Sequence, residues 1–198
     1  MNHITRVKLL YAFYSPFQNI KLALVGVKTK GLVFTGGRLF VSRCKYSTIS
    51  IGRNCRFMSK ETGNLLGINH RCILATYNAN AKLEIGNGSS FSGVSSWCFE
   101  HITIGNNVRV GANCTIMDGD AHQDDPRAGK NRPVVIEDNV WLGANVTVLK
   151  GVTIGHNSLI GAGSVVTKSI PANVIAAGNP CKVIRSLDAG IIEKLEKA

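Results

Sequence analysis

One stretch of this chain repeats a six-residue unit without a slip. From Ile136 to Pro171 it reads IEDNVW, LGANVT, VLKGVT, IGHNSL, IGAGSV and VTKSIP. Each unit opens with Ile, Leu or Val, has Val, Ser or Ile fifth, and commonly has Gly or another small or polar residue second. A period of six fits neither a strand nor an amphipathic helix. It predicts a solenoid, in which each unit buries its apolar face by stacking on its neighbours.

Six residues suit one short strand followed by a corner where Gly or Asn turns the chain. Three such sides close one coil, so this stretch supplies two coils of a parallel β-helix. Earlier hexads begin at Ile51, Ile68 and Ile85. Residues 75–82 and 92–101 break the register, which predicts loops or altered corners in both places.

The repeat stops between His122 and Val135, where the sequence is HQDDPRAGKNRPVV. Its Pro, Gly, Asp and Arg content is typical of a loop that leaves a scaffold, and such loops often carry function. The segment that leads into it, Met117-Asp-Gly-Asp-Ala-His122, is the strongest chemical motif in the chain.

Residues 46–186 resemble the hexapeptide-repeat acyltransferases, and the resemblance rests on the hexads and on two tail segments. Gly161–Lys168 and Ala177–Arg185 resemble the end of the sugar O-acetyltransferase branch of that family. The resemblance implies an all-β, left-handed parallel β-helix with a protruding loop. Its handedness comes from the family, because parallel crossovers are otherwise almost always right-handed. It also implies a homotrimer with active sites between subunits.

We expect three segments along the chain: a basic N-terminal cap over 1–45, the β-helix over 46–185 with its loop at 122–135, and a short helix over 186–198 that Ser186 caps. Residues 4–28 predict a short helix and a second short element on either side of Pro16. These either cover the open end of the solenoid or contact a membrane surface.

His122 is the expected general base, because the motif before it resembles the Asp-rich turn that ends in the catalytic His of the sugar acetyltransferases. An alcohol becomes a good nucleophile only when its proton is removed, and histidine titrates near neutrality. A carboxylate on the other ring nitrogen fixes the tautomer and stabilises the imidazolium. Asp118 and Asp120 are both candidates for that carboxylate, and the sequence leaves the choice open.

The resemblance also implies residues for the acetyl donor and for the acceptor. The expected donor site, for acetyl-CoA as co-substrate and without a metal, comprises Trp141, Gly143, Ala144, Ala162, Thr167, Lys168, Lys182 and Arg185. The turn at Gly143–Ala144 is also expected to donate hydrogen bonds to the oxyanion. The upstream Asn and Asp of the maltose and galactoside enzymes are missing, so Ser95, Glu100 and His101 are the expected acceptor contacts.

The positive charge of the chain lies in its first third. Residues 1–60 hold eleven Lys or Arg and no Asp or Glu, whereas the rest holds twelve of each. This one-sided field implies an anionic partner: a phospholipid surface, a lipid- or nucleotide-linked sugar, or nucleic acid. No nucleic-acid motif is present, so nucleic acid is not expected. No segment reads as a membrane span or a secretory signal, which predicts a cytoplasmic protein, with peripheral contact at the inner face of the membrane as one option.

The predicted function is therefore an acetyl-CoA-dependent O-acetyltransferase that acts on a saccharide, specifically a cell-surface polysaccharide or its precursor. The alternative is an N-acetyltransferase of a nucleotide amino sugar or a xenobiotic acetyltransferase. A metal-dependent hydrase is disfavoured because the five histidines include no close-spaced pair. Cys55, Cys72 and Cys114 share one repeat position and are expected to face the coil interior as small hydrophobes.

Overall fold

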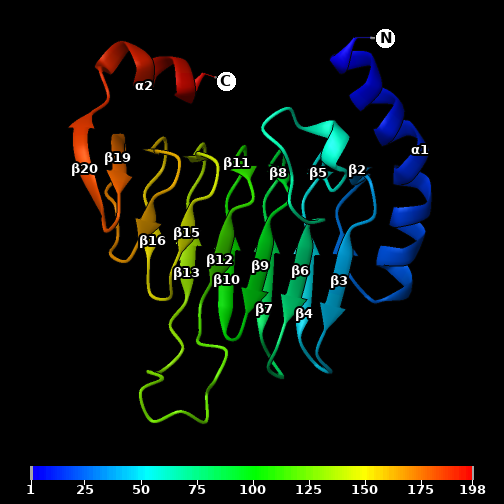
Figure 1. Ribbon diagram of the computed structural model, residues 1–198, viewed down its shortest axis with the longest axis horizontal. Helices are drawn as coiled ribbons and strands as arrows, with labels where there is room; N and C mark the ends of the chain where they lie inside the picture. The colour runs from blue at the N-terminus through cyan, green and yellow to red at the C-terminus, as the bar shows by residue number, and fades with distance from the viewer. Residues whose placement is uncertain (1, 198) are drawn as a thin grey trace.

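The hexads form the sides of a triangular prism (Figure 1). The computed structural model describes residues 2–197 of the chain. In the stretch Ile136–Pro171, every first and fifth residue of a hexad is buried. The fourth residue turns most of the corners with a positive φ, for example 59° at Asn139 and 77° at Gly151. Asn and Gly tolerate this left-handed conformation, which is why they recur at the corners.

Three parallel sheets wind around one core, and successive strands pass from sheet A to B to C. Sheet A holds β1 (Lys28–Thr29), β4 (Thr48–Ile51), β7 (Lys82–Ile85), β10 (His101–Ile104), β13 (Val134–Ile136) and β16 (Thr153–Ile154). Sheet B holds β2 (Phe34–Gly36), β5 (Arg56–Met58), β8 (Ser90–Ser92), β11 (Arg109–Ala112), β14 (Trp141–Leu142), β17 (Leu159–Ile160), β19 (Val174–Gly178) and the antiparallel β20 (Cys181–Ser186). Sheet C holds β3 (Phe40–Arg43), β6 (Ile73–Thr76), β9 (Ser95–Cys98), β12 (Thr115–Met117), β15 (Thr147–Val148) and β18 (Val165–Val166). The parallel β-helix predicted from the repeat, left-handed as the family resemblance implies, is confirmed.

The interior of the prism is filled by aliphatic side chains and by the cysteines that the repeat places inside. Cys55, Cys72 and Cys114 are fully buried, as predicted. Burial raises the pKa of the Cys114 thiol to about 11. Burial, reinforced by the nearby Asp118 carboxylate, raises that of Cys98 to about 12. These thiols therefore stay protonated near neutral pH and serve as packing groups.

The first coil is closed by α1 (His3–Leu24), a helix that the sequence did not predict as one piece. Pro16 lies inside it, so the expected interruption at this residue is wrong. Bonds to β2 fix the helix on both sides of the proline. The Ser15 hydroxyl accepts from the Thr35 N–H at 3.0 Å, and the Asn19 amide bonds both the N–H and the C=O of Val33. These side chains form hydrogen bonds with backbone groups at the open edge of the first coil, which would otherwise be unpaired.

Two further expectations need correction. Residues 92–101 contain β9, which pairs in register with β6 and β12 rather than forming a loop. Its inward positions are Ser96 and Cys98 and its outward one is Trp97, so the usual apolar alternation is inverted. At the C-terminus, Ser186 ends β20, and the short helix α2 (Ala189–Glu196) begins after Asp188.

Among the residues that the structure describes, two long excursions leave the coils: residues 59–72 between β5 and β6, which include the 3-10 turn η1 (Glu61–Gly63), and residues 118–133 between β12 and β13. The second excursion (the long loop) leaves from the edge where sheet C passes to sheet A (the C–A edge). In Figure 1 it protrudes from the lower side of the prism, whereas α2 lies along the upper side. Within residues 2–197, no helix is both long enough and apolar enough to cross a bilayer.

Candidate active site

The root of the long loop is fixed by one buried carboxylate. Asp118 is fully buried and accepts hydrogen bonds from the N–H groups of Phe99, Glu100 and His101 at 2.6, 2.8 and 2.6 Å. Three amide donors of this kind stabilise a buried ionised carboxylate. Asp118 therefore clamps the β9–β10 corner to the coil that follows, and it positions the start of the long loop.

A lysine that the sequence analysis missed ties the loop to the next coil. Lys150 follows β15 and pairs with Asp120, and its ammonium also donates to the Gly129 carbonyl at 3.2 Å. The contact joins both arms of the loop. Lys150 is the third residue of its hexad, and the other hexads carry Asp, Ala, His or Lys at that position. A charged residue there is therefore common, and the sequence does not distinguish Lys150 from the others.

His122 lies just beyond these two tethers, and its side chain is exposed. Its carbonyl accepts from the Asp125 N–H at 3.2 Å, which shapes a turn. Within the described part of the chain, no hydrogen bond joins the His122 ring to Asp118 or Asp120. Both carboxylates have other partners: backbone amides for Asp118 and Lys150 for Asp120.

The three expected acceptor residues lie in different places. Glu100 lines an open hollow of about 600 Å³ together with Gln123, Lys130 and Asn131 of the long loop. His101 instead faces the outside of sheet A, where its ring bonds Glu84 at 2.7 Å. Ser95 begins β9, at the end of the strand away from the loop. Of the three, only Glu100 is therefore brought to the long loop by the fold.

Three aromatic side chains that were not predicted as site residues stand beside the root of the loop. The Tyr77 and Trp97 rings are 6.0 Å apart at centroid, and each lies 5.0 Å from Phe99. Phe99 is buried beneath the loop, so closely that a methyl group at Gly119 would lie 2.7 Å from the ring. Tyr77 remains about half exposed. We call Tyr77 and Trp97 the aromatic ledge.

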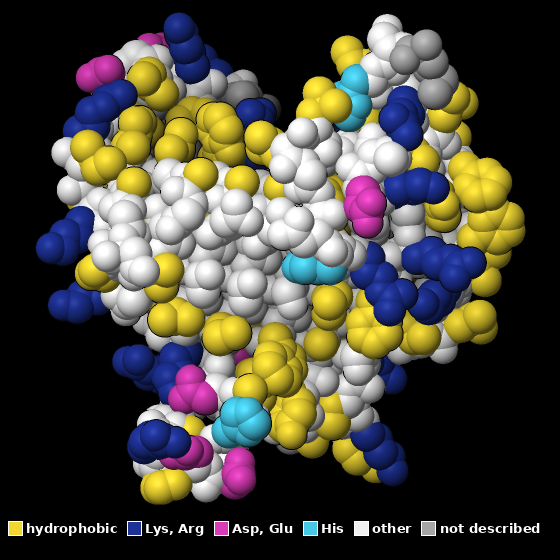
Figure 2. All heavy atoms as spheres, in the orientation of Figure 1, with side chains coloured by type: hydrophobic (Ala, Val, Ile, Leu, Met, Phe, Trp, Pro, Cys, Tyr) yellow, Lys and Arg dark blue, Asp and Glu magenta, His cyan; other side chains and the backbone are white. Residues whose placement is uncertain are grey.

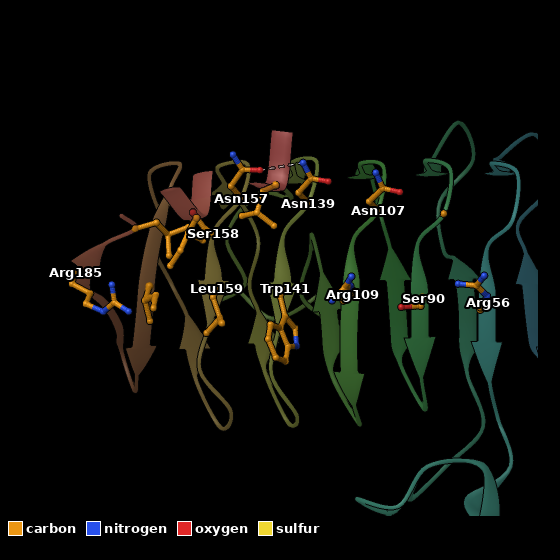
Figure 3. Close-up of a pocket in the computed structure, with 15 residues that line it drawn as sticks. Arg56, Ser90, Asn107, Arg109, Asn139, Trp141, Asn157, Ser158, Leu159 and Arg185 are labelled. Carbon is orange, nitrogen blue, oxygen red and sulfur yellow. Dashed lines mark hydrogen bonds between the residues drawn. The ribbon is translucent and has the colours of Figure 1, made fainter. Parts of the chain in front are cut away.

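A second hollow of about 560 Å³ lies between sheet B and α2, and two of the expected donor residues meet there (Figure 3). Trp141 and Arg185 line it with two further arginines, Arg56 and Arg109. Figure 3 shows Arg109, Trp141 and Leu159 side by side on successive strands. Three guanidinium groups around an exposed indole and an aliphatic floor fit a ligand with phosphates and a narrow apolar arm.

Comparison with known proteins places this architecture. The family model described as "Bacterial transferase hexapeptide (six repeats)" matches residues 133–168. That described as "Hexapeptide repeat of succinyl-transferase" matches residues 101–119. These matched segments carry the hexapeptide repeats of the family, and the chain is similar to its acetyltransferases. The galactoside O-acetyltransferase of Escherichia coli (strain K12) is 47% identical over 91 residues, which are 44% of this chain and 45% of that protein. The chain thus spans about half the length of the curated relatives it matches.

Solved structures of relatives extend the likeness over most of the chain. A maltose O-acetyltransferase from Clostridium difficile 630 superposes with a TM-score of 0.53 and 27% identity, over 94% of this chain and 84% of that one. A galactoside acetyltransferase in complex with coenzyme A superposes with a TM-score of 0.54 and 27% identity, over 94% of this chain and 79% of that one.

The remaining residues expected at the donor site lie at two edges of the prism. Gly143, Ala144 and Ala162 stack at the edge between sheets B and C, where a methyl group at Gly143 would lie 2.6 Å from the Ala162 nitrogen. The Gly143 N–H donates to the Ile160 carbonyl at 2.8 Å. It is therefore not free to donate to an oxyanion, contrary to the expectation. Thr167 and Lys168 follow β18 at the C–A edge, the edge that carries His122, and Lys182 lies on β20.

His122 and the arginine-lined hollow therefore lie on opposite sides of one chain, because the C–A edge of a triangular prism faces away from sheet B. In Figure 1 the long loop and α2 are correspondingly on opposite sides. A single copy cannot bring Trp141 and His122 to one reacting centre. Within residues 2–197, no cluster of three His, Cys, Asp or Glu residues could hold a metal ion.

Proposed function

We propose that this chain is an acetyl-CoA-dependent O-acetyltransferase that acetylates a hydroxyl of a saccharide, with His122 as general base. The observation that carries the proposal is the position of His122: an exposed imidazole on a loop whose two arms are tied to the coils by Asp118 and Lys150. The names of the sugar acetyltransferases that the chain resembles support the reaction class.

The reaction proceeds by direct transfer. His122 removes the proton of the acceptor hydroxyl as its oxygen attacks the thioester carbonyl. The carbon–sulfur bond then breaks, and the coenzyme A thiolate leaves and takes up the proton that the imidazolium carried. The carbonyl oxygen becomes negative on the way and needs a hydrogen-bond donor. With the Gly143 N–H engaged, the Ala144 amide is the remaining candidate at that turn.

The two aspartates act on the loop rather than on the imidazole in the free protein. Asp118 sets where the loop begins, and Asp120 with Lys150 sets how it lies over the next coil. The exposed His122 ring is then aligned when the acceptor binds, since catalytic hydrogen bonds often tighten only in the complex.

The donor site is completed by a second copy of the chain. A homotrimer with sites between subunits places the sheet B hollow of one copy, with Trp141 and Arg185, opposite the His122 loop of the next. This arrangement brings together the sheet B hollow and the His122 loop, which lie too far apart within one chain to form one site. Thr167 and Lys168 then lie on the same side of the cleft as the base.

The acceptor side has the chemistry of a saccharide site. Sugar rings present C–H groups that stack on aromatic faces and hydroxyls that bond carboxylates and amides. The aromatic ledge supplies the first kind of contact, and Glu100 and Gln123 supply the second. We infer a cell-surface polysaccharide or its precursor as the acceptor, because the residues that hold a free disaccharide in the galactoside branch have no counterpart here.

The test is a calorimetric titration with acetyl-CoA, followed by a thiol-release assay against a panel of acceptors. The panel holds free disaccharides, bacterial polysaccharides, lipid-linked oligosaccharides and nucleotide amino sugars. Saturable binding near one site per chain, with release of coenzyme A on a polysaccharide or a lipid-linked sugar, is the expected result. Turnover confined to amino sugars would overturn oxygen acetylation, and absence of binding at millimolar ligand would overturn the donor.

A further inference from the structure

Helix α1 has more apolar surface than the fold uses. Its inner face packs on β2 through Ser15, Gln18 and Leu22, which are buried. Five large apolar side chains recur at intervals of three or four residues on the opposite face: Leu9, Phe13, Phe17, Ile20 and Leu24. Their exposure ranges from 55% at Leu9 to 82% at Leu24. We call these five residues the outer stripe.

The outer stripe is a continuous feature. At about 100° per residue, its members fall within one arc of roughly 80°, turned about 180° from the buried residues. From Leu9 to Leu24 it covers fifteen residue steps, or about 22 Å of helix. Phe13 contacts Tyr14 and Phe17 edge-on or tilted, so part of the stripe is already organised. Isolated exposed apolar residues are ordinary, but a contiguous stripe marks a contact surface.

Exposed cations surround this stripe. All eleven Lys and Arg residues of the first sixty are exposed, and none forms an ion pair within the described chain. Arg6 and Lys60 border a hollow of about 400 Å³ with Leu9 and Phe13. In Figure 2 the right edge, over α1, is yellow with dark blue side chains beside it.

An apolar stripe with unpaired cations fits one class of partner best. A second copy docking face to face would bring two cation-rich surfaces together, which is repulsive. Nucleic acid would satisfy the cations and leave the apolar stripe in water. An anionic bilayer satisfies both, with acyl chains around the apolar groups and lipid phosphates around Lys and Arg.

We propose that the outer stripe of α1 binds the surface of an anionic phospholipid bilayer, with the helix lying in the plane of the headgroups and the prism standing away from it. The buried inner face stays on β2, so the contact needs no unfolding of the cap. The proposal is independent of the acetyl-transfer reaction.

The experiment is vesicle flotation of the full chain with liposomes of phosphatidylcholine alone or with 30% phosphatidylglycerol. We expect binding to the anionic vesicles that weakens with salt, and none to the neutral ones. Phe13→Ser with Phe17→Ser should lower the affinity by about a hundredfold or more. Lys21→Glu with Lys28→Glu should lower it by about tenfold or more.

Matched controls use exposed residues elsewhere. Leu65→Ser with Leu66→Ser removes two leucines that are 83% and 76% exposed, and Lys168→Glu with Lys182→Glu makes the same charge change in the neutral part of the chain. Both should bind like the wild type. Thermal melts followed by circular dichroism show whether each variant folds. The comparison of wild-type binding to anionic and to neutral vesicles tests the proposal without any variant.

Three results would overturn the proposal: no binding of the wild type to anionic vesicles, equal loss in the control variants, or full binding by the double Phe variant. If sedimentation shows that the double Phe variant loses an oligomeric state while the wild type ignores vesicles, the stripe is a contact between copies. Tight, salt-dependent DNA binding that the Phe changes leave intact, without vesicle binding, would point to nucleic acid.

Discussion

The long loop at 118–133 and helix α1 both extend beyond the regular coils, and their chemistry is opposite. The loop is polar, and it is held at its root by a buried carboxylate and across its arms by Lys150. The helix carries the apolar outer stripe, and it is held along its inner face by Ser15 and Asn19. The long loop presents the imidazole of His122 at a fixed place, whereas α1 presents an apolar surface with positive charges near it. This difference separates a place for chemistry from a place for attachment.

The largest effect should come from His122→Ala. Removal of the proposed base should lower kcat by about 10²–10⁴-fold. Because the side chain is exposed, the melting temperature should not change, and vesicle binding through α1 should be intact. The measurement is steady-state kinetics on the acceptor that the panel identifies, with Asp124→Ala, a change at an exposed neighbour, as the control. Full activity of the His122 variant would remove His122 from the mechanism.

Asp118→Asn should affect the scaffold of the loop. The amide places an NH₂ group among three N–H donors, so at least one backbone amide loses its acceptor, and the charge that strengthens the others is gone. We expect a loss of about 3 kcal/mol in the free energy of unfolding, together with lower activity. Urea denaturation gives the value, and Asp124→Asn on the exposed part of the loop is the control. A difference below about 0.5 kcal/mol would show that the carboxylate does not anchor the loop.

Trp97→Leu should separate acceptor from donor. Loss of the stacking surface should raise KM for the saccharide by about tenfold, while KM for acetyl-CoA stays the same. The matched change is Phe40→Leu, an outward aromatic residue on β3 of the same sheet. An equal rise for both substrates would mean that the aromatic ledge supports the fold and not the sugar.

The smallest effect should follow Lys150→Met, which retains the stem and removes the ammonium. Partly exposed ion pairs contribute about 1 kcal/mol or less, so stability should hardly change. We still expect kcat to fall several-fold, because the two arms of the loop are no longer joined, whereas vesicle binding should be normal. Faster proteolysis within residues 118–133 provides an independent readout, and unchanged proteolysis would contradict the tether.

The sequence specified the coils because one local rule repeats. First and fifth residues point inward and Asn or Gly turns the corners, so no distant information is needed for the hexads at 136–171. The rule failed at β9, where Ser96 and Cys98 take the inward positions. It failed at α1, because this helix buries the polar Ser15 and Gln18 and exposes its large apolar residues, so it lacks the usual amphipathic pattern. Bonds from Ser15 and Asn19 to the first coil also outweigh the break expected at Pro16.

The site was predictable only in part. The resemblance singled out His122 on the long loop, and it singled out Trp141 and Arg185, which line the hollow between sheet B and α2. Asp118 was one of two candidates, with Asp120, for the carboxylate that supports the histidine, yet its partners are the amides 17 to 19 residues upstream. Three six-residue sides make eighteen residues per coil, so this offset is a direct neighbour on the stack. Lys150 meets Asp120 across thirty residues because the long loop is inserted between them.

The stacked coils also act as a spacer of fixed length. Helix α1 packs on the first coil, and the long loop leaves the fourth, so three coil steps separate them. Each step is one strand spacing of about 4.8 Å, which gives about 14 Å with no hinge in between. If α1 rests on a bilayer, the imidazole of His122 is held at a set height above it. That height selects which sugar of a membrane-attached glycan, counted outward from its lipid, comes within reach, and adding or deleting one coil would shift it by a single step.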